Sequence, residues 1–282
     1  MKTKKNITKL ICLLLVFINL LLVPSIIYVE AKEKYSEKQL IKKIEGIINW
    51  KKESAGIASD DPLLNNQYLE HAGETVGDWF PIGIGRIGYK DDYNAYLAVI
   101  NDMVSQRYMR EDKLDGTKST EWHRISLAIL AMGGDPTSVG KDENNQSIHL
   151  IADGTYNRGK TVSLGAQGIN GWIWGLLALD SMRYKIPEDA FYSRDDIIKE
   201  ILQLQLADGG FSFYHNKTDP DITGMALQAL APYYNSEQTY TFQQKATKKT
   251  VTKTVRQVVD ESIQTLSELQ LSEGDFASWE TE

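Results

Sequence analysis

The sequence predicts an all-α fold built from repeated helical hairpins. Two stretches fit one pattern of glutamine, three residues, glycine, one residue and an aromatic: residues 205–211 (QLADGGF) and 270–276 (QLSEGDF), sixty-five residues apart. A signature repeated at such a distance is typical of repeat architectures, in which each two-helix unit buries its apolar face only by stacking on its neighbours. The sequence contains no period-two alternation long enough to predict a sheet.

Four apolar helices are expected at intervals along the chain. Residues 219–234 predict a helix with Leu227 and Leu230 on one face. The same apolar pair, preceded six residues earlier by a polar residue, occurs four times: Asp78 before Ile84 and Ile87, Glu121 before Leu127 and Leu130, Asn170 before Leu176 and Leu179, and Asp221 before Leu227 and Leu230. The steps are 43, 49 and 51 residues, and we expect these segments to be inner helices.

More polar, amphipathic segments lie between the apolar ones and are expected to be their outer partners. They cover residues 36–53, 91–110, 194–205 and 251–270. Along the chain we expect four complete hairpins and half of a fifth. Gly133, Gly134 and Pro136 end the second apolar helix, because glycine accepts the left-handed cap conformation and proline cannot continue the helix. Residues 235–253 are crowded with Gln, Thr and Lys and are expected to be an exposed connection.

These features resemble the squalene cyclase and protein prenyltransferase repeat family, which includes the terpenoid cyclases and has an α/α-toroid fold. The resemblance is carried by the two signatures and by DPDIT (219–223), TEWHRISLAILAMGGDP (120–136) and QGINGWIWGLLALDS (167–181). It is closest to the secreted bacterial members. The DITGMA segment (221–226) is also similar to the toroid domain of the cobalamin carriers. The resemblance implies one toroid domain over residues 32–282.

The first 31 residues have the pattern of a secretory signal peptide. Four lysines precede an apolar run over residues 10–23, and Val29-Glu30-Ala31 forms a small-residue cleavage site. We therefore expect a secreted or cell-surface domain. The alternative is an N-terminal membrane anchor, because the apolar stretch continued to Val29 reaches the ~20 residues that a spanning helix needs.

Composition of the remaining 251 residues agrees with export. Without the leader, 27 basic and 37 acidic residues remain, a net charge of -10, which argues against a nucleic-acid partner. The one cysteine, Cys12, lies in the leader, so the mature chain has no thiol. Five basic residues and no acidic one lie over residues 245–256, which indicates either a solvated helix face or attraction to anionic polymers of the cell envelope.

The last outer segment has no inner helix after it in this sequence, so we expect a toroid truncated at its C-terminus. The resemblance implies about five to seven hairpins in a closed toroid. We further expect an exposed apolar strip on the last outer helix, formed by Val255, Val258, Val259, Ile263 and Leu266.

Asp219 and Asp221 are the candidate catalytic residues. The resemblance implies an Asp-x-Asp-Asp motif in cyclases that protonate an alkene or epoxide, with the central aspartic acid as proton donor in an apolar cavity. Asp219, Asp221 and Thr223 match that motif, but Ile222 replaces its last aspartate. The alternative is that Asp221 is a helix N-cap, with Asp219 adding charge at the positive end of the helix dipole.

The same N-terminal positions of the inner helices are candidates for a ligand cavity. In a toroid these ends face one mouth of the central cavity, where polar groups and aromatic walls suit a bulky, mostly apolar or corrin-like ligand. We expect at least two of the four tryptophans to be core residues. The candidate cavity residues are Asp78, Trp79, Glu121, Trp122, His123, Asn170, Trp172, Trp174 and Thr223.

No cofactor or metal site is expected. Residues 219–230 resemble the start of a calcium-binding loop, but Leu230 stands where the bidentate glutamate is needed. The mature chain also lacks the cysteine of a prenyltransferase zinc site.

Two functions of different classes remain. The first is a non-catalytic extracytoplasmic domain that binds an apolar or corrin-like ligand, and the second is a terpenoid cyclase-like isomerase with Asp221 as general acid.

Overall fold

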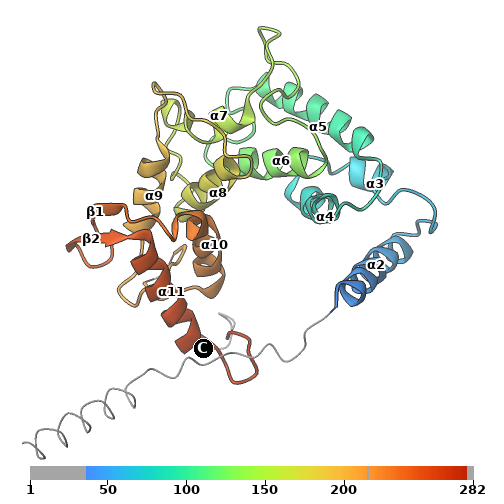
Figure 1. Cartoon of the computed structure of the whole chain (residues 1–282). Helices are drawn as coiled ribbons and strands as arrows, with labels where there is room; N and C mark the ends of the chain where they lie inside the picture. The colour runs from blue at the N-terminus through green and yellow to red at the C-terminus, as the bar shows by residue number, and fades with distance from the viewer. Residues whose placement is uncertain (1–35, 215, 278–282) are drawn as a thin grey trace, which may run out of the picture. The chain divides into compact units, whose positions relative to one another are not determined.

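The computed structural model describes residues 36–214 and 216–277 (Figure 1). It divides into two compact parts, Met1–Ser59 and Asp60–Glu282. About half of the described residues are helical, in ten α-helices with a few short 3-10 turns, and the only sheet among them has two strands. None of these helices is both long and apolar enough to cross a bilayer. The expected leader, residues 1–31, lies outside the described residues.

The first part contains one described helix, α2, Glu37–Ser54. Its start is fixed by a capping box, in which the Ser36 hydroxyl accepts from the Gln39 backbone N–H and the Gln39 side chain accepts from the Ser36 backbone. Two lysines in the last turn, Lys51 and Lys52, complement the negative end of the helix dipole. The helix expected over residues 36–53 is therefore confirmed.

Four helices of the second part occupy the places predicted for the inner helices, and we keep that name for them. They are α4 (Thr75–Arg86), α6 (Thr120–Ala131), α8 (Ile169–Asp180) and α10 (Pro220–Leu230). Each packs on the next in sequence order, and Figure 1 shows α4 and α10 at opposite ends of the row. The four helices predicted from the repeated apolar pair are thus present. Their buried faces include Ile84, Ile125, Leu176 and Leu230.

The remaining helices of the second part precede, separate or follow these four in the chain. They are α3 (Asn66–Leu69), α5 (Tyr93–Tyr108), α7 (Leu150–Gly154), α9 (Arg194–Leu202) and α11 (Val255–Leu269), with 3-10 turns at Arg158–Lys160 and Ala231–Tyr233. α9 packs on α8, and α11 packs on α10. The count of four complete hairpins was wrong, because α7, the element packed on α6 before α8 begins, has only five residues.

A β-hairpin connects α10 to α11, and its presence corrects the all-α prediction to a mostly helical fold. Strand β1, Thr239–Gln243, pairs antiparallel with β2, Thr250–Thr254. The first strand has a short period-two pattern, with Tyr240 and Phe242 buried and the residues between them exposed. We missed it because five residues are a short run, and Val251 was assigned to the helix that begins at Val255.

The two signature stretches fold into the same loop. In loop 1, residues 205–211, the Gln205 side chain donates to the Gly209 carbonyl at 2.9 Å, and the Leu206 N–H donates to the Gly210 carbonyl at 2.8 Å. The equivalent bonds in loop 2, residues 270–276, measure 2.7 Å and 2.8 Å. The central glycine has a φ of +98° in loop 1 and +93° in loop 2, a conformation that favours glycine.

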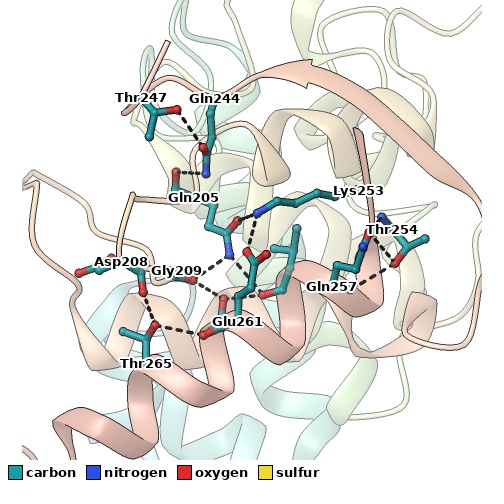
Figure 2. Close-up of polar contacts among 12 residues, drawn as sticks. Gln205, Asp208, Gly209, Gln244, Thr247, Lys253, Thr254, Gln257, Glu261 and Thr265 are labelled. Carbon is teal, nitrogen blue, oxygen red and sulfur yellow. Dashed lines mark hydrogen bonds and ion pairs between the residues drawn. The ribbon is translucent and has the colours of Figure 1, made fainter. Parts of the chain in front are cut away.

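The buried Gln205 links loop 1 to the β-hairpin and to α11 through hydrogen bonds (Figure 2). Beyond its bond within the loop, the Gln205 amide donates to the Val258 carbonyl at 3.3 Å and accepts from the Lys253 ammonium at 3.1 Å. The backbone carbonyl of Gln205 accepts from the Gln244 side chain at 3.4 Å. One glutamine therefore joins three segments that are distant in sequence.

The apolar strip expected on α11 is only partly exposed. Val255, Val258 and Val259 are buried, whereas Ile263 is exposed and Leu266 is half-buried. The prediction was wrong for the three valines because α10 and β2 pack on α11 and cover them.

We predict that Gln205→Ala lowers the free energy of unfolding by roughly 2–3 kcal/mol, because it removes three hydrogen bonds of a buried side chain. Gln270→Ala is the matched control, since it removes the same loop bond at an exposed position, and it should cost about 1 kcal/mol or less. Urea unfolding of the two variants measures both. Equal losses would contradict the role given to Gln205.

Candidate functional site

The N-terminal halves of α4, α6 and α8 enclose a cavity of about 150 Å³. Four residues expected at the cavity line it, namely Trp79 from α4, Glu121 from α6, and Asn170 and Trp174 from α8. They meet because the three helices pack in order and each presents its first two turns to the same space. The full lining is Thr75, Trp79, Thr120, Glu121, Arg124, Gln167, Asn170 and Trp174.

An aromatic pair forms part of the cavity wall. The rings of Trp79 and Trp174 have centroids 5.4 Å apart and an interplanar angle of 58°. Trp79 is 45% exposed, so one edge of the pair remains open to solvent. Tilted aromatic walls of this kind provide an apolar contact surface for a ligand group.

A buried ion-pair network forms the floor of the cavity. The Arg124 Nε donates to Asp78 at 2.9 Å, and its two terminal nitrogens donate to the two Glu121 oxygens at 2.7 and 2.9 Å. The same guanidinium donates to the Thr75 hydroxyl and to the Gly73 carbonyl. Burial alone would lower the pKa of Arg124, but its hydrogen bonds with Glu121 and Asp78 raise it overall, so the guanidinium stays charged.

Asp78 lies beneath the cavity wall and does not line it. It is fully buried, and besides Arg124 it accepts from the Gly73 N–H and the Tyr96 hydroxyl, each at 2.9 Å. Burial raises the pKa of Tyr96, so Tyr96 acts as a donor here. Sequence reasoning missed Arg124, although its spacing of three residues from Glu121 on a helix signals an ion pair.

Most polar groups of this network are already paired within the protein. Arg124 makes five hydrogen bonds within the protein, so its guanidinium is already engaged and is not free to recruit an anion. By contrast, the buried Asn170 side-chain oxygen has no protein partner. Gln167 accepts from the Thr120 hydroxyl at 2.9 Å. The cavity therefore holds one buried acceptor without a protein partner, the Asn170 side-chain oxygen.

Two of the four candidate tryptophans are core residues, as we expected. The fully buried Trp122 donates from its indole nitrogen to the Tyr108 hydroxyl at 2.7 Å, and the Arg158 guanidinium lies 4.2 Å from its ring centroid. The Trp172 ring meets Tyr192 edge-on at 5.2 Å. Neither tryptophan lines the cavity.

His123 and Thr223 also lie in the core and outside the cavity lining. The His123 Nε2 is 2.6 Å from the Gly154 carbonyl and donates to it, while its Nδ1 is buried without a protein partner. Burial lowers the pKa of His123 to about 4, so the ring is neutral. The Thr223 hydroxyl accepts from the Phe211 N–H at 2.9 Å and donates to the Phe211 carbonyl at 3.2 Å.

Asp219, and not Asp221, is the N-cap of α10. Its side chain accepts from the backbone N–H groups of Asp221 and Ile222 at 2.9 and 3.3 Å. Asp221 is exposed in the first turn, and neither aspartate lines the cavity. The capping interpretation also fails for Asp78, Glu121 and Asn170, because the N-cap positions are Glu74, Ser119 and Gly168.

No protein-family model matches the chain, and neither the curated proteins nor the solved structures contain a significant match. Within residues 36–214 and 216–277, no group of three or more His, Cys, Asp or Glu side chains is arranged to hold a metal ion.

We predict that Asp219→Ala lowers the free energy of unfolding by about 1 kcal/mol, the usual cost of losing an N-cap side chain. Asp221→Asn should change it by about 0.5 kcal/mol or less, because Asp221 contributes only a solvent-exposed charge near the helix N-terminus. Chemical denaturation of both variants measures the difference. A larger loss for Asp221→Asn would show that Asp221 has a structural role beyond this charge.

We predict that His123 makes the chain less stable in acid. Its folded pKa of about 4 lies below the ordinary 6.5, so the unfolded state binds the extra proton, and stability is complete above pH 6.5 and falls towards pH 4. The loss approaches about 3 kcal/mol. Urea unfolding between pH 7 and 4 should show a shallower decline for His123→Gln. An unchanged slope in His123→Gln would refute the prediction.

Proposed function

We propose that this chain is an extracytoplasmic, non-catalytic binding domain of the α/α-toroid type that holds one end of a largely apolar ligand between α4, α6 and α8. The observation that carries the proposal is the convergence of Trp79, Glu121, Asn170 and Trp174 from three successive inner helices on one cavity. The extracytoplasmic location rests on the signal-peptide pattern of residues 1–31.

We also propose that this chain has the architecture of the squalene cyclase and prenyltransferase family. It is supported by the ordered packing of α4, α6, α8 and α10, and by two signature loops with matching hydrogen bonds. Repeated units that stack in order and present equivalent residues to one side are the basis of such folds.

The cavity volume limits how much of the ligand is enclosed. Pockets that enclose a drug-sized ligand measure about 300–1,000 Å³, so the 150 Å³ found here accommodates one end of such a molecule. A slender apolar chain fits this limit better than a corrin ring, of which only an edge could enter. The rest of the ligand would lie along the exposed edge of Trp79.

The polar groups indicate which end of the ligand enters. The Asn170 oxygen lacks a donor, whereas Arg124 is saturated by protein acceptors. A buried acceptor without a partner is costly, so a ligand that donates a hydrogen bond to Asn170 gains affinity. We therefore propose a ligand with an apolar body and a hydroxyl or other donor at its end.

The placement of the aspartates favours binding over catalysis. A proton donor for an alkene must be a carboxylic acid kept protonated in an apolar cavity. Asp221 is exposed, and Asp219 already accepts two backbone hydrogen bonds as a cap. Burial raises the pKa of Asp78, but Asp78 is engaged by Arg124 and Tyr96 and does not line the cavity.

We predict that farnesol, an apolar chain with a terminal hydroxyl, binds the full chain in isothermal titration calorimetry. Trp79→Ala should weaken binding about tenfold, because it removes one wall of the cavity. Trp50→Ala is the matched control, since Trp50 is a more exposed tryptophan on α2, and it should bind like wild type. Hydroxocobalamin tests the corrin-like alternative. Binding of neither compound, or equal affinity of farnesol for both variants, would count against this site.

A further inference from the structure

Two amide side chains at the start of α8 give the cavity a donor and an acceptor that the ion-pair network does not use. Gln167 lies directly before Gly168, the N-cap of α8, and Asn170 is the second residue of that helix. Both side chains line the cavity together with Trp174. The hydrogen bonds that these two amides make, and those that they lack, therefore indicate which polar group of a ligand fits there.

The orientation of the Gln167 amide is fixed by Thr120 at the start of α6. The Thr120 hydroxyl and the Thr120 backbone N–H approach the same Gln167 side-chain atom, at 2.9 and 3.4 Å. A backbone N–H can only donate, so this atom is the amide oxygen Oε1. The amide nitrogen Nε2 is not engaged by Thr120, and no other group of the described residues accepts from it. Gln167 therefore contributes a donor to the cavity.

Asn170 contributes an acceptor beside this donor. Its side-chain oxygen Oδ1 is buried and has no protein partner. The amide nitrogen Nδ2 is bonded to the same carbon, so a half-turn of the amide exchanges the two atoms and still leaves one donor and one acceptor at this place. A polar group that stays without a partner in a ligand complex lowers the affinity, so a ligand that satisfies both Gln167 and Asn170 is favoured.

The charges beneath the cavity distinguish between the polar groups that a ligand could carry. The single positive charge of Arg124 is shared by two carboxylates, Asp78 and Glu121, so a ligand carboxylate would lie near Glu121 without a counter-charge. An ammonium group has no acceptor for the Gln167 donor, and a hydroxyl has one oxygen for both positions. A carboxamide is neutral and carries an N–H donor and a carbonyl acceptor on neighbouring atoms.

We propose that the ligand of this cavity is an acyl amide, in which an apolar chain ends in a carboxamide. This inference rests on the function proposed above and names the chemical class of its ligand. The ligand carbonyl accepts from the Gln167 Nε2, and the ligand N–H donates to the Asn170 side-chain oxygen. The apolar chain leaves the cavity along the pair of Trp79 and Trp174, whose rings form the apolar part of the wall.

The test compares four compounds that have the same apolar chain and different ends, each titrated into the full chain at pH 7 by isothermal titration calorimetry. Decanamide should bind about tenfold more tightly than decan-1-ol, because a hydroxyl leaves one of the two amide side chains without a partner. Decanoate is ionised and decylamine is protonated at this pH, and both should bind more weakly than decanamide.

Two variants change the two positions separately. Gln167→Glu keeps an acceptor for Thr120 and replaces the Nε2 donor by a carboxylate oxygen, so decanamide should bind at least tenfold more weakly and decylamine more tightly than they bind to wild type. Gln228→Glu makes the same change at an exposed position of α10 outside the cavity lining, and it should leave both affinities unchanged. Asn170→Leu should bring decanamide to the affinity of decan-1-ol. Circular dichroism shows whether each variant keeps its fold.

Failure of the amide assignment and failure of the proposed function give different results. If decanamide and decan-1-ol bind equally and Trp79→Ala weakens both, the cavity binds apolar chains but does not recognise an amide. Tighter binding of decylamine or decanoate than of decanamide would make the ligand a charged one, and unchanged decanamide affinity in Gln167→Glu would remove Gln167 from recognition. If none of the four compounds binds, the proposed function fails together with the amide assignment.

Discussion

The ion pair between Asp78 and Arg124 is the interaction on which the candidate site depends. It joins α4 to α6 in a place where neither charge reaches solvent, and Arg124 extends the contact to the Gly73 backbone just before α4. Removing one member of a buried pair leaves an uncompensated charge, at a typical cost of roughly 3–5 kcal/mol. Trp79 follows Asp78 in α4, and Glu121 lies one turn before Arg124 in α6. The same contact therefore sets the distance between two walls of the cavity.

A second contact between these helices fixes their direction. A Cβ at Gly85 would lie 2.4 Å from the Ala131 carbonyl, so the backbones of α4 and α6 approach closely there. Gly85 is seven residues after Asp78, and Ala131 is seven residues after Arg124. Equal spacing of two contacts, about two helical turns apart, means that α4 and α6 run parallel with a fixed register. Their N-terminal ends consequently lie on the same side, as a shared cavity requires.

Much of the fold could be predicted from the sequence because its signals are periodic. The four inner helices follow from apolar pairs three residues apart. The glutamine and glycine at fixed spacing predicted a repeat, and the two stretches do form matching loops, although their conformation was not predicted. The β-hairpin could not be predicted with the same ease, since only Tyr240 and Phe242 mark its buried face. The short α7 was missed for a different reason, because an amphipathic pattern does not indicate how many turns a helix has.

The candidate site was predictable only at the level of helix ends. Position in the repeat identified Glu121, Asn170, Trp79 and Trp174, which do meet at the cavity. It also selected Trp122, His123 and Trp172, whose side chains are buried in the core. Helices can differ in their rotation about their own axes, so the same position in the repeat can face the cavity in one helix and the core in another. Arg124 was overlooked because a charged residue in an apolar helix is normally expected on the surface, whereas here two carboxylates make its burial possible.

The N-terminus of α10 explains why the cavity involves three inner helices and not four. Loop 1 delivers Phe211 to this end of α10, where its N–H donates to the Thr223 hydroxyl and its carbonyl accepts from the Asp219 N–H. Asp219 in turn caps the helix, with Pro220 directly after it at a position where no backbone donor is needed. Asp219 and Thr223 of α10 are thus used to cap the helix and to hold the signature loop. The signature loop therefore has a structural role at this end of α10, and the cavity is lined by the helices whose N-terminal side chains remain available.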